Sequence, residues 1–376
     1  MSGREWLYTP QDLKQMQEFP LERKIQIAQT RIIEWISKNQ SNVFVSFSGG
    51  KDSTVLLDLV RRVERSIPAV FSNTGLEFPE IRKFALSHEN VIEVRPEIPF
   101  GQVLTKYGYP LISKDVSQTI QQARSPASGI SVRKKLMLLG KCYYKKPNGE
   151  MGLSRYNCPQ YLEICNLPIK ISQQCCLVMK ERPMDKWQRK NKRLPFVGTM
   201  ASESMRRKAA WQHLGCNAFD SDRPRSAPLS IWTEQDVLQY VLKFGIEICS
   251  VYGDIVPVFS KTKGGTSESP CLRCTGRQRT GCIFCCYGAH IKDIGDSRFQ
   301  ALAKSHPKLY DYCMRGGQWI DNPKYDPSMP KWNATVPEWY NWNPKKIWVP
   351  NERGLGYKVM FDMVNSVMGK DFYRYD

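Results

Sequence analysis

The sequence lacks the long apolar segments of membrane and secreted proteins. It contains no run of about 18 apolar residues, and its first residues, Met1 to Glu5, form no apolar signal segment. It also contains no internal repeat and no long low-complexity tract, which argues against a repeat architecture. These absences predict a soluble cytoplasmic protein with no membrane partner.

Acidic side chains are in the minority. The chain has 36 Asp and Glu against 55 Lys and Arg, so its net charge is +19 and its pI is near 9.4. A surplus of this size favours a polyanionic partner, and we expect nucleic acid, either DNA or tRNA. The basic residues concentrate in two runs, 133–146 and 186–193, although each run taken alone is also compatible with a solvated surface.

Apolar residues follow helical and strand-like patterns in turn. Apolar positions in 21–36 recur with a helical period, and short apolar runs at 43–45, 68–71 and 91–94 predict strands. A further helix is expected to begin with Thr233 as its N-cap. Strands that alternate with helices predict an α/β fold with a doubly wound parallel sheet, in which ligands bind beyond the carboxyl ends of the strands.

The 376 residues are expected to form three parts. These are an N-terminal helical segment at 1–40, a nucleotide-binding α/β domain at 41–260 with an inserted basic segment at about 101–185, and a C-terminal region at 261–376. The last region holds five tryptophans among prolines between residues 315 and 350. This composition predicts an irregular arm with aromatic anchors, with base stacking as the alternative role.

One loop joins the first predicted strand to a helix start. Two adjacent glycines allow the backbone to approach an anion closely, and the start of the next helix favours negative charge. The hydroxyls of Ser48 and Ser53 and the ammonium of Lys51 add donors, so the loop is expected to bind pyrophosphate. The Walker A spacing is missing. The loop reads Ser46-Phe47-Ser48-Gly49-Gly50-Lys51-Asp52-Ser53.

Residues Ser48 to Ser53 match the SGGxDS signature, and the loop resembles that of the PP-loop ATP pyrophosphatases, which cleave ATP between the α and β phosphates. The resemblance implies that ATP and Mg²⁺ bind here and that Lys51 and Asp52 are catalytic residues. A second segment follows the next predicted strand and is expected to complete the nucleotide site. The expected nucleotide-binding residues are Ser46, Ser48, Gly49, Gly50, Lys51, Ser53, Asn73, Thr74 and Gly75.

The thirteen cysteines are the second unusual feature. In a cytosolic protein such clusters indicate metal or catalytic sites before disulfides. Four thiolates can hold either a zinc ion or a [4Fe–4S] cluster, and spacing alone does not separate the two. The grouped cysteines are the pair Cys175 and Cys176, the CxxC motif of Cys271 and Cys274, and the CxxC motif of Cys282 and Cys285.

Several motifs between roughly residues 40 and 290 resemble those of the adenylylsulfate and phosphoadenylylsulfate reductase family. They are (D/N)TGxxFPE from Asn73, CCxxxKxxP from Cys175, ESxxR from Glu203 to Arg207 and PLxxWTxxDV from Pro228. The resemblance implies that Arg207 contacts phosphate. In iron–sulfur members a double cysteine and a later CxxC bind one [4Fe–4S] cluster. The implied ligands are therefore Cys175, Cys176, Cys282 and Cys285, and the alternative is a zinc or iron–sulfur site in which Cys271 and Cys274 replace the first pair.

Two departures from the reductases point to another activity. No cysteine follows Cys313, whereas sulfate-reducing members use a redox cysteine near the C-terminus. Those reductases also carry a degraded nucleotide loop, whereas the loop here is complete, which implies ATP as the substrate. The chain most resembles the ATP pyrophosphatases of DNA phosphorothioation systems (DndC/SspD type).

That resemblance implies an ATP pyrophosphatase of sulfurtransferase type. An acceptor oxygen, expected to belong to a DNA backbone phosphate, would attack the α-phosphate of ATP, and sulfur from a cysteine desulfurase would then displace AMP. Other subunits of such a modification system are expected partners. The alternatives are a tRNA thiolation enzyme, a sulfonucleotide reductase that uses Cys313 or a partner's nucleophile, and a non-enzymatic DNA-binding module that senses nucleotide or redox state. Cys142, Cys158, Cys165 and Cys313 are assigned no role, and each is left open as a candidate for an exposed sulfur-carrying thiol.

Overall fold

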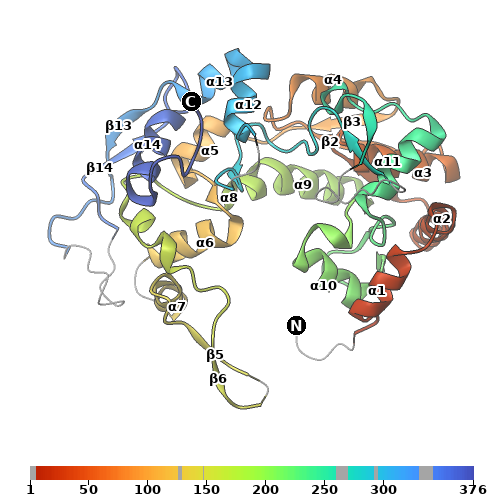
Figure 1. Ribbon diagram of the computed structural model, residues 1–376, viewed down its shortest axis with the longest axis horizontal. Helices are drawn as coiled ribbons and strands as arrows, with labels where there is room; N and C mark the ends of the chain where they lie inside the picture. Colours follow the sequence, from red (N-terminus) through yellow and green to blue (C-terminus); the bar gives the residue numbers. More distant parts are fainter. Residues whose placement is uncertain (1–5, 126–128, 147, 260–269, 292–294, 330–341) are drawn as a thin grey trace. The chain divides into compact units, whose positions relative to one another are not determined.

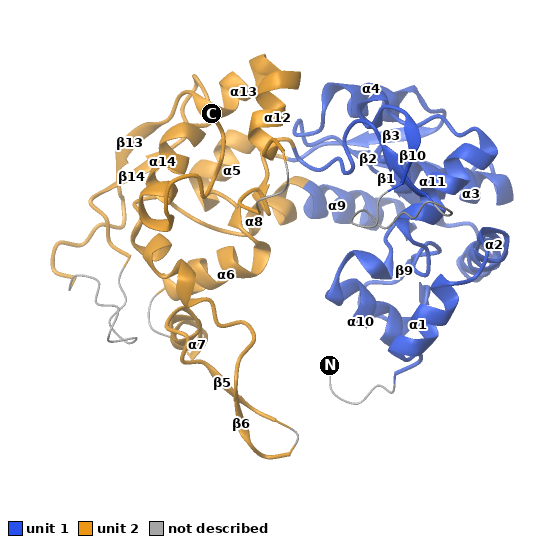
Figure 2. Ribbon diagram, viewed as in Figure 1, with its two compact units in different colours: residues 1–96, 180–282 blue, residues 97–179, 283–376 orange. Residues whose placement is uncertain are grey.

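The computed structural model describes residues 6–125, 129–146, 148–259, 270–291, 295–329 and 342–376. The chain forms two compact units, and each unit is built from two separate stretches of sequence (Figure 2). Unit 1 comprises 1–96 and 180–282, and unit 2 comprises 97–179 and 283–376. The basic segment expected as an insertion therefore forms a unit together with the C-terminal region, and unit 1 continues past the expected boundary at residue 260.

Unit 1 contains an α/β sheet whose strands are ordered β3-β2-β1-β7-β9-β8. Its strands β2 and β3 lie side by side in Figure 1. All neighbouring pairs are parallel except β8 with β9. The strands are β1 (Val43–Phe47), β2 (Ala69–Ser72), β3 (Val91–Val94), β7 (Leu194–Val197), β8 (Asn217–Ala218) and β9 (Arg225–Ser226), with a separate antiparallel pair β10 (Ile255–Val258) and β11 (Cys271–Cys274). The helices are α1 (Pro10–Gln17), α2 (Leu21–Lys38), α3 (Lys51–Val63), α4 (Pro79–Ser87), α9 (Arg182–Asn191), α10 (Met205–Leu214) and α11 (Glu234–Phe244), with 3-10 turns η4 (Ala201–Glu203) and η5 (Ser250–Tyr252).

Side chains on β1 show that both faces of the sheet are covered. Val43 and Val45 belong to the core that also contains residues of α2, α3 and α11. Phe44, which points to the other face because strand side chains alternate, packs edge-on against Trp187 of α9 at 4.9 Å between ring centroids. A parallel sheet buried on both faces is the doubly wound α/β fold predicted from the sequence. The strands expected near 43, 69 and 91 and the helix expected at 21–36 are all present.

Unit 2 is mainly helical and has three short strand pairs. Its helices are α5 (Phe100–Tyr107), α6 (Lys114–Ala123), α7 (Gly129–Leu138), α8 (Gln174–Cys176), α12 (Arg298–Ser305), α13 (Pro307–Met314) and α14 (Tyr357–Met368), with 3-10 turns η1 (Pro159–Tyr161) and η2 (Glu163–Asn166). Its strands pair as β4 (Leu111–Ile112) with β12 (Cys286–Tyr287), β5 (Tyr143–Lys145) with β6 (Met151–Leu153), and β13 (Gln318–Asp321) with β14 (Lys346–Val349). A π-helical turn η3, Leu177–Glu181, carries the chain from unit 2 into unit 1.

The tryptophan-rich region is more regular than predicted. Its residues 318–321 and 346–349 pair as antiparallel strands, so the expectation of an irregular arm is wrong for them. Trp348 is buried and meets Trp319 edge-on at 5.4 Å between centroids, and Trp342 Nε1 donates to the Leu167 carbonyl at 2.9 Å. These rings act as anchors within unit 2. Trp332 and Trp339 lie outside the described residues.

The helices of the described ranges include none with the length and apolar character needed to cross a lipid bilayer.

A buried ion pair joins α2 to the start of α11. Lys24 Nζ lies 2.7 Å from Asp236 Oδ2, and the two side chains are 2% and 9% exposed. Asp236 is also the N3 residue of a capping box in which Thr233 is the N-cap, as predicted. Removing one partner of such a pair leaves an uncompensated charge in the core.

We therefore predict that Lys24→Met lowers the free energy of unfolding by about 3 to 5 kcal/mol, measured by urea denaturation. Arg65→Ala is the control, because its ion pair with Glu89 is 84% and 80% exposed and the expected loss is below about 1 kcal/mol. The double variant Lys24→Met/Asp236→Asn should recover part of the loss because it removes both charges. A Lys24→Met protein as stable as the wild type would contradict this role.

Candidate nucleotide site

The predicted nucleotide loop follows β1 and opens α3. Gly50 is the N-cap of α3 and contributes no side-chain cap, so backbone groups form the surface there. Gly49 has φ +70°, and a Cβ at this position would lie 3.0 Å from the backbone oxygen of Ile81. Position 49 therefore requires glycine for both its backbone conformation and its close contact with α4.

The two loop serines bond to each other and to the glycine backbone. Ser48 Oγ and Ser53 Oγ lie 2.9 Å apart, and Ser53 Oγ donates to the Gly50 carbonyl at 2.9 Å. The Ser48 backbone N–H donates to Ser53 Oγ at 3.2 Å. Ser48 is exposed and Ser53 is buried, so Ser53 shapes the loop from inside while Ser48 presents its hydroxyl to the surface.

Lys51 is oriented into unit 1. Its ammonium lies 3.0 Å from Glu234 Oε1 and donates to the Gln278 carbonyl at 2.8 Å, and its side chain is 4% exposed. Burial lowers the pKa of Lys51, but the charges of Asp52 and Glu234 outweigh that effect and raise the pKa overall. The Lys51 backbone N–H donates to Tyr252 Oη at 3.1 Å. In this arrangement Lys51 ties the loop to α11 and to the segment after β11.

Asp52 is the loop residue whose bonding is incomplete. Its Oδ1 is buried and has no hydrogen-bond partner among the described residues, although Lys51 Nζ lies 3.9 Å away. Burial raises the pKa of Asp52 and Lys51 opposes the shift, while the charges of Glu203 and Glu234 raise the pKa further. A buried carboxylate oxygen of this kind is the type of oxygen donor that Mg²⁺ prefers.

The segment after β2 forms a second turn beside the loop. The Gly75 N–H donates to Asn73 Oδ1 at 3.0 Å, and Gly75 has φ +72°. Thr74 donates through its backbone N–H and its hydroxyl to the carboxylate of Glu77, at 3.0 and 2.8 Å. Asn73 and Thr74 are buried, so their side chains fix the turn, while the exposed Gly75 is the part open to a ligand.

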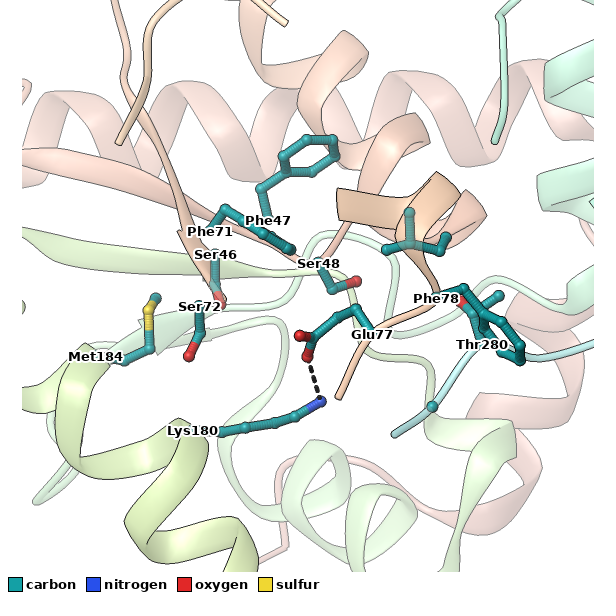
Figure 3. A pocket seen from close by; sticks show the side chains of 12 residues that line it. Ser46, Phe47, Ser48, Phe71, Ser72, Glu77, Phe78, Lys180, Met184 and Thr280 are labelled. Atoms are coloured by element: carbon teal, nitrogen blue, oxygen red, sulfur yellow. Dashed lines mark ion pairs between the residues drawn. The ribbon is translucent and has the colours of Figure 1, made fainter. Parts of the chain in front are cut away.

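A pocket of about 140 Å³ lies at the carboxyl ends of β1 and β2, within unit 1 (Figure 3). The predicted residues Ser46 and Ser48 line it, whereas Lys51 is not among the described residues that do. Apolar walls suit a flat ring system, and the hydroxyls of three serines and one threonine supply polar contacts. The full lining is Ser46, Phe47, Ser48, Phe71, Ser72, Glu77, Phe78, Ile81, Lys180, Met184, Thr280 and Gly281.

Lys180 is the basic residue of this pocket. In Figure 3 its side chain extends toward Glu77, and its Nζ lies 3.7 Å from Glu77 Oε1. The side chain is 41% exposed, so its ammonium can exchange this weak pairing for a phosphate oxygen. Lys180 belongs to the CCxxxKxxP motif, but the sequence did not lead to its prediction as a site residue. Its fixed distance from the double cysteine was the available signal.

Arg207 lies at another pocket of unit 1. This pocket, of about 240 Å³, lies beside β7 and α10 and is lined by Met200, Arg207, Trp211 and Arg225 among others. The Arg207 guanidinium pairs with Glu203, four residues earlier. Arg207 is not among the described residues that line the pocket at Ser48, so its predicted contact with the same phosphates has no support from this geometry.

Three of the four predicted cluster ligands, Cys175, Cys176 and Cys285, belong to unit 2. Burial raises the pKa of Cys285, and the charge of Cys176 raises it further. Burial also raises the pKa of Tyr287, and the charges of all three thiols raise it further, so each thiol lies within electrostatic range of that ring. Cys282 ends unit 1, and chain connectivity keeps it within about 11 Å of Cys285.

Thiols alone make up this donor set, which is the chemistry that iron–sulfur clusters and zinc require. Within the described ranges, no three His, Cys, Asp or Glu side chains are grouped so as to hold a metal ion as they lie. The residues fit the predicted group in donor type, whereas their arrangement among the described residues does not form a metal site.

The alternative pair does not fit a shared metal. Cys271 and Cys274 lie on strand β11, where residues three apart point to opposite faces. Cys274 is buried near Lys51, whose charge partly offsets the rise in pKa that burial of Cys274 causes. One metal ion cannot take both thiols from this strand, so the Cys271 and Cys274 alternative is not supported.

None of the four open candidates for a sulfur-carrying thiol is exposed. Cys313 is 0% exposed, and burial raises its pKa well above the ordinary value. The other candidates are buried as well, namely Cys142, Cys158 and Cys165. These thiols pack as small apolar groups and are not poised to attack a bound nucleotide.

Comparisons with known proteins agree with the motifs. The sequence profile of the phosphoadenosine phosphosulfate reductase domain matches residues 42–110 and 131–286, more than half of the chain. Among solved structures, that of phosphoadenylyl-sulfate (PAPS) reductase from Candida auris in its phosphate complex is similar over 66% of this chain and 92% of its own, with 11% identity and a TM-score of 0.34. A search of curated proteins gave no match.

The two glycine turns allow a matched test of the loop. We predict that Gly49→Ala destabilises the protein by about 1 to 2 kcal/mol more than Gly75→Ala. The two residues have similar positive φ, but only position 49 has backbone within 4 Å of the added Cβ. Urea unfolding of both variants measures the difference, and equal losses would show that close packing against α4 is not a constraint.

Proposed function

The chain belongs to the phosphoadenosine phosphosulfate reductase family, and on that basis we propose that it is an ATP pyrophosphatase that activates an acceptor oxygen for replacement by sulfur. The observation that carries the proposal is a complete SGGxDS loop whose Ser48 lines a pocket that also contains Lys180. The pocket lies at the carboxyl ends of parallel strands, where α/β folds bind nucleotides. The family makes the chain a nucleotide-utilising enzyme of PP-loop type, and ATP is our choice of nucleotide.

The proposed reaction has two displacements. The first occurs at the α-phosphorus of ATP, and the second occurs at the adenylated acceptor. The acceptor oxygen bonds to the α-phosphorus, the bond from that phosphorus to the α,β-bridging oxygen breaks, and pyrophosphate leaves with the electron pair. A persulfide sulfur supplied by a cysteine desulfurase then displaces AMP from the adenylated acceptor, and a thiol reductant cleaves the resulting S–S bond to leave sulfur on the acceptor. The first step needs positive charge beside the leaving pyrophosphate, to stabilise the negative charge that develops on it. The second step needs a good leaving group, which AMP provides.

Different residues are suited to the charges of the first step. The loop backbone at Gly49 and Gly50 and the start of α3 would hold the phosphates. Lys180 would neutralise charge as pyrophosphate leaves, and Asp52 would hold Mg²⁺, which supplies further positive charge when bound. Lys51, paired with Glu234, would act as a positioning residue for the loop.

We propose a DNA backbone phosphate as the acceptor, as in DNA phosphorothioation. The net charge of +19 supports a polyanionic acceptor, but it would suit tRNA equally. A [4Fe–4S] cluster held by Cys175, Cys176, Cys282 and Cys285 would supply redox or structural chemistry when bound. Other modification-system subunits and the cysteine desulfurase are the proposed partners, and the cytoplasm is the proposed location.

The activity is tested by pyrophosphate release from ATP and Mg²⁺ in the presence of duplex DNA as acceptor, with anaerobically purified protein. We expect Lys180→Ala to lower kcat/KM by about 10- to 100-fold, because one charged contact to phosphate is lost. Lys190→Ala is the matched control, since this exposed lysine lies on α9 and outside the pocket. An enzyme that releases no pyrophosphate from ATP but reduces an adenylylated sulfate would favour the reductase alternative. Nucleotide binding without turnover of either substrate would favour the sensing module.

The cluster is tested by the visible thiolate-to-iron absorption of anaerobically prepared protein. We expect the band to be lost in Cys176→Ser and Cys285→Ser and kept in Cys313→Ser, because Cys313 is a buried apolar contact in the same unit. Cys271→Ser should also keep the band. Loss of absorption in Cys271→Ser with retention in Cys176→Ser would reverse the ligand assignment.

A further inference from the structure

The β5–β6 hairpin of unit 2 leaves large apolar side chains exposed on both faces. Tyr143 pairs with Leu153 on one face, and their side chains are 54% and 58% exposed. Met151 is 63% exposed, and Tyr144 on the opposite face is 47% exposed. A two-stranded hairpin with neither face covered is marginally stable by itself, so this surface is suited to a partner.

The base of the hairpin is firmly held. The Ser154 N–H donates to the Cys142 carbonyl at 2.9 Å, and Asn157 Nδ2 donates to the carbonyls of Gly140 and Cys142 at 3.1 and 3.2 Å. The Cys158 N–H donates to the Met137 carbonyl of α7 at 2.9 Å. The ribbon therefore projects from a fixed support, as Figure 2 shows for this part of unit 2.

Charge identifies the class of partner. Residues 129–158, which contain α7 and the hairpin, carry seven Lys and Arg and one acidic residue, Glu150. Lys141, Lys145 and Arg155 are exposed beside the tyrosines. Protein interfaces deplete lysine from their apolar centres, whereas nucleic-acid surfaces interleave basic and aromatic side chains. The combination favours a polyanion over another protein.

The aromatic and basic groups are partly preorganised. The Arg155 guanidinium lies 5.0 Å from the centre of the Tyr156 ring, and Arg155 Nη2 donates to Tyr156 Oη at 3.0 Å. A guanidinium held in this way loses less freedom when it contacts a phosphate.

We propose that the described part of the β5–β6 hairpin, residues 141–146 and 148–156, is a duplex-DNA-binding ribbon that enters the major groove. The major groove of B-DNA admits a two-stranded β-ribbon, whereas the major groove of A-form RNA is too narrow and deep. Lys141, Lys145 and Arg155 would contact phosphates, and the tyrosine, methionine and leucine side chains would cover sugars and thymine methyl groups. The inference rests on the proposed function for its choice of DNA as the acceptor, and it adds the element that binds this acceptor.

The test is fluorescence anisotropy of a labelled DNA duplex at several salt concentrations, without ATP. For Lys141→Ala/Lys145→Ala/Arg155→Ala we expect at least about tenfold weaker binding, and a salt slope smaller by about 2 to 3, because three phosphate contacts are lost. The matched control is Lys14→Ala/Lys38→Ala/Lys83→Ala, which removes the same charge from exposed positions of unit 1. This control should bind nearly as wild type.

Further measurements control for unfolding of the variants and for the type of duplex. The thermal midpoints of both triple variants are compared, and the single reversal Lys145→Glu, with Lys83→Glu as its control, replaces the triple variant if that variant unfolds. An RNA duplex of the same sequence should bind more weakly. Equal affinity of hairpin and control variants, or tighter binding to the RNA duplex, would overturn the proposal. Because the assay needs no ATP, failure of pyrophosphate release alone would count against the proposed activity and not against the ribbon.

Discussion

The buried ion pair between Lys24 and Asp236 is the interaction on which the arrangement of unit 1 depends. It holds α2 against the first turn of α11, in a core where an unpaired charge would be costly. The same turn carries Glu234, which pairs with Lys51 at the start of α3. One helix start thus connects α2 to the nucleotide loop. The described residues of the segment 1–40, expected as a separate part, belong to unit 1.

Local sequence and tertiary contacts determine different features of the nucleotide loop. Glycines at 49 and 50 set the backbone, and this follows from residue type alone. The direction of Lys51 does not follow, because its ammonium has two possible destinations, a phosphate or a protein carboxylate. The position of Glu234, far along the chain, decides between them, and Lys180 becomes the cation that lines the pocket.

The positions of the thiols likewise do not follow from local sequence alone. Cys271 and Cys274 have the CxxC spacing of a metal site, but a strand directs their thiols to opposite faces, whereas a tight turn would bring them together. Cys175 and Cys285 are distant in sequence and belong to the same unit because 97–179 and 283–376 fold together. The spacing of two cysteines predicts whether they share a metal only when the backbone conformation between them is known. Burial of Cys313 likewise depends on what packs around it, which no local pattern records.

Sequence alone determined the features that depend on nearest neighbours: the helix cap at Thr233, the parallel strands and their turns, the SGGxDS loop and the excess of basic charge. Hydrogen bonding, backbone sterics and residue type act over a few positions, so a single sequence expresses them directly. The tertiary structure decided which distant groups share a site, which thiols are exposed, and that the basic run at 133–146 supplies one strand of a ribbon with both faces uncovered. These outcomes depend on long-range packing, where burial and partner position set the energy of each side chain.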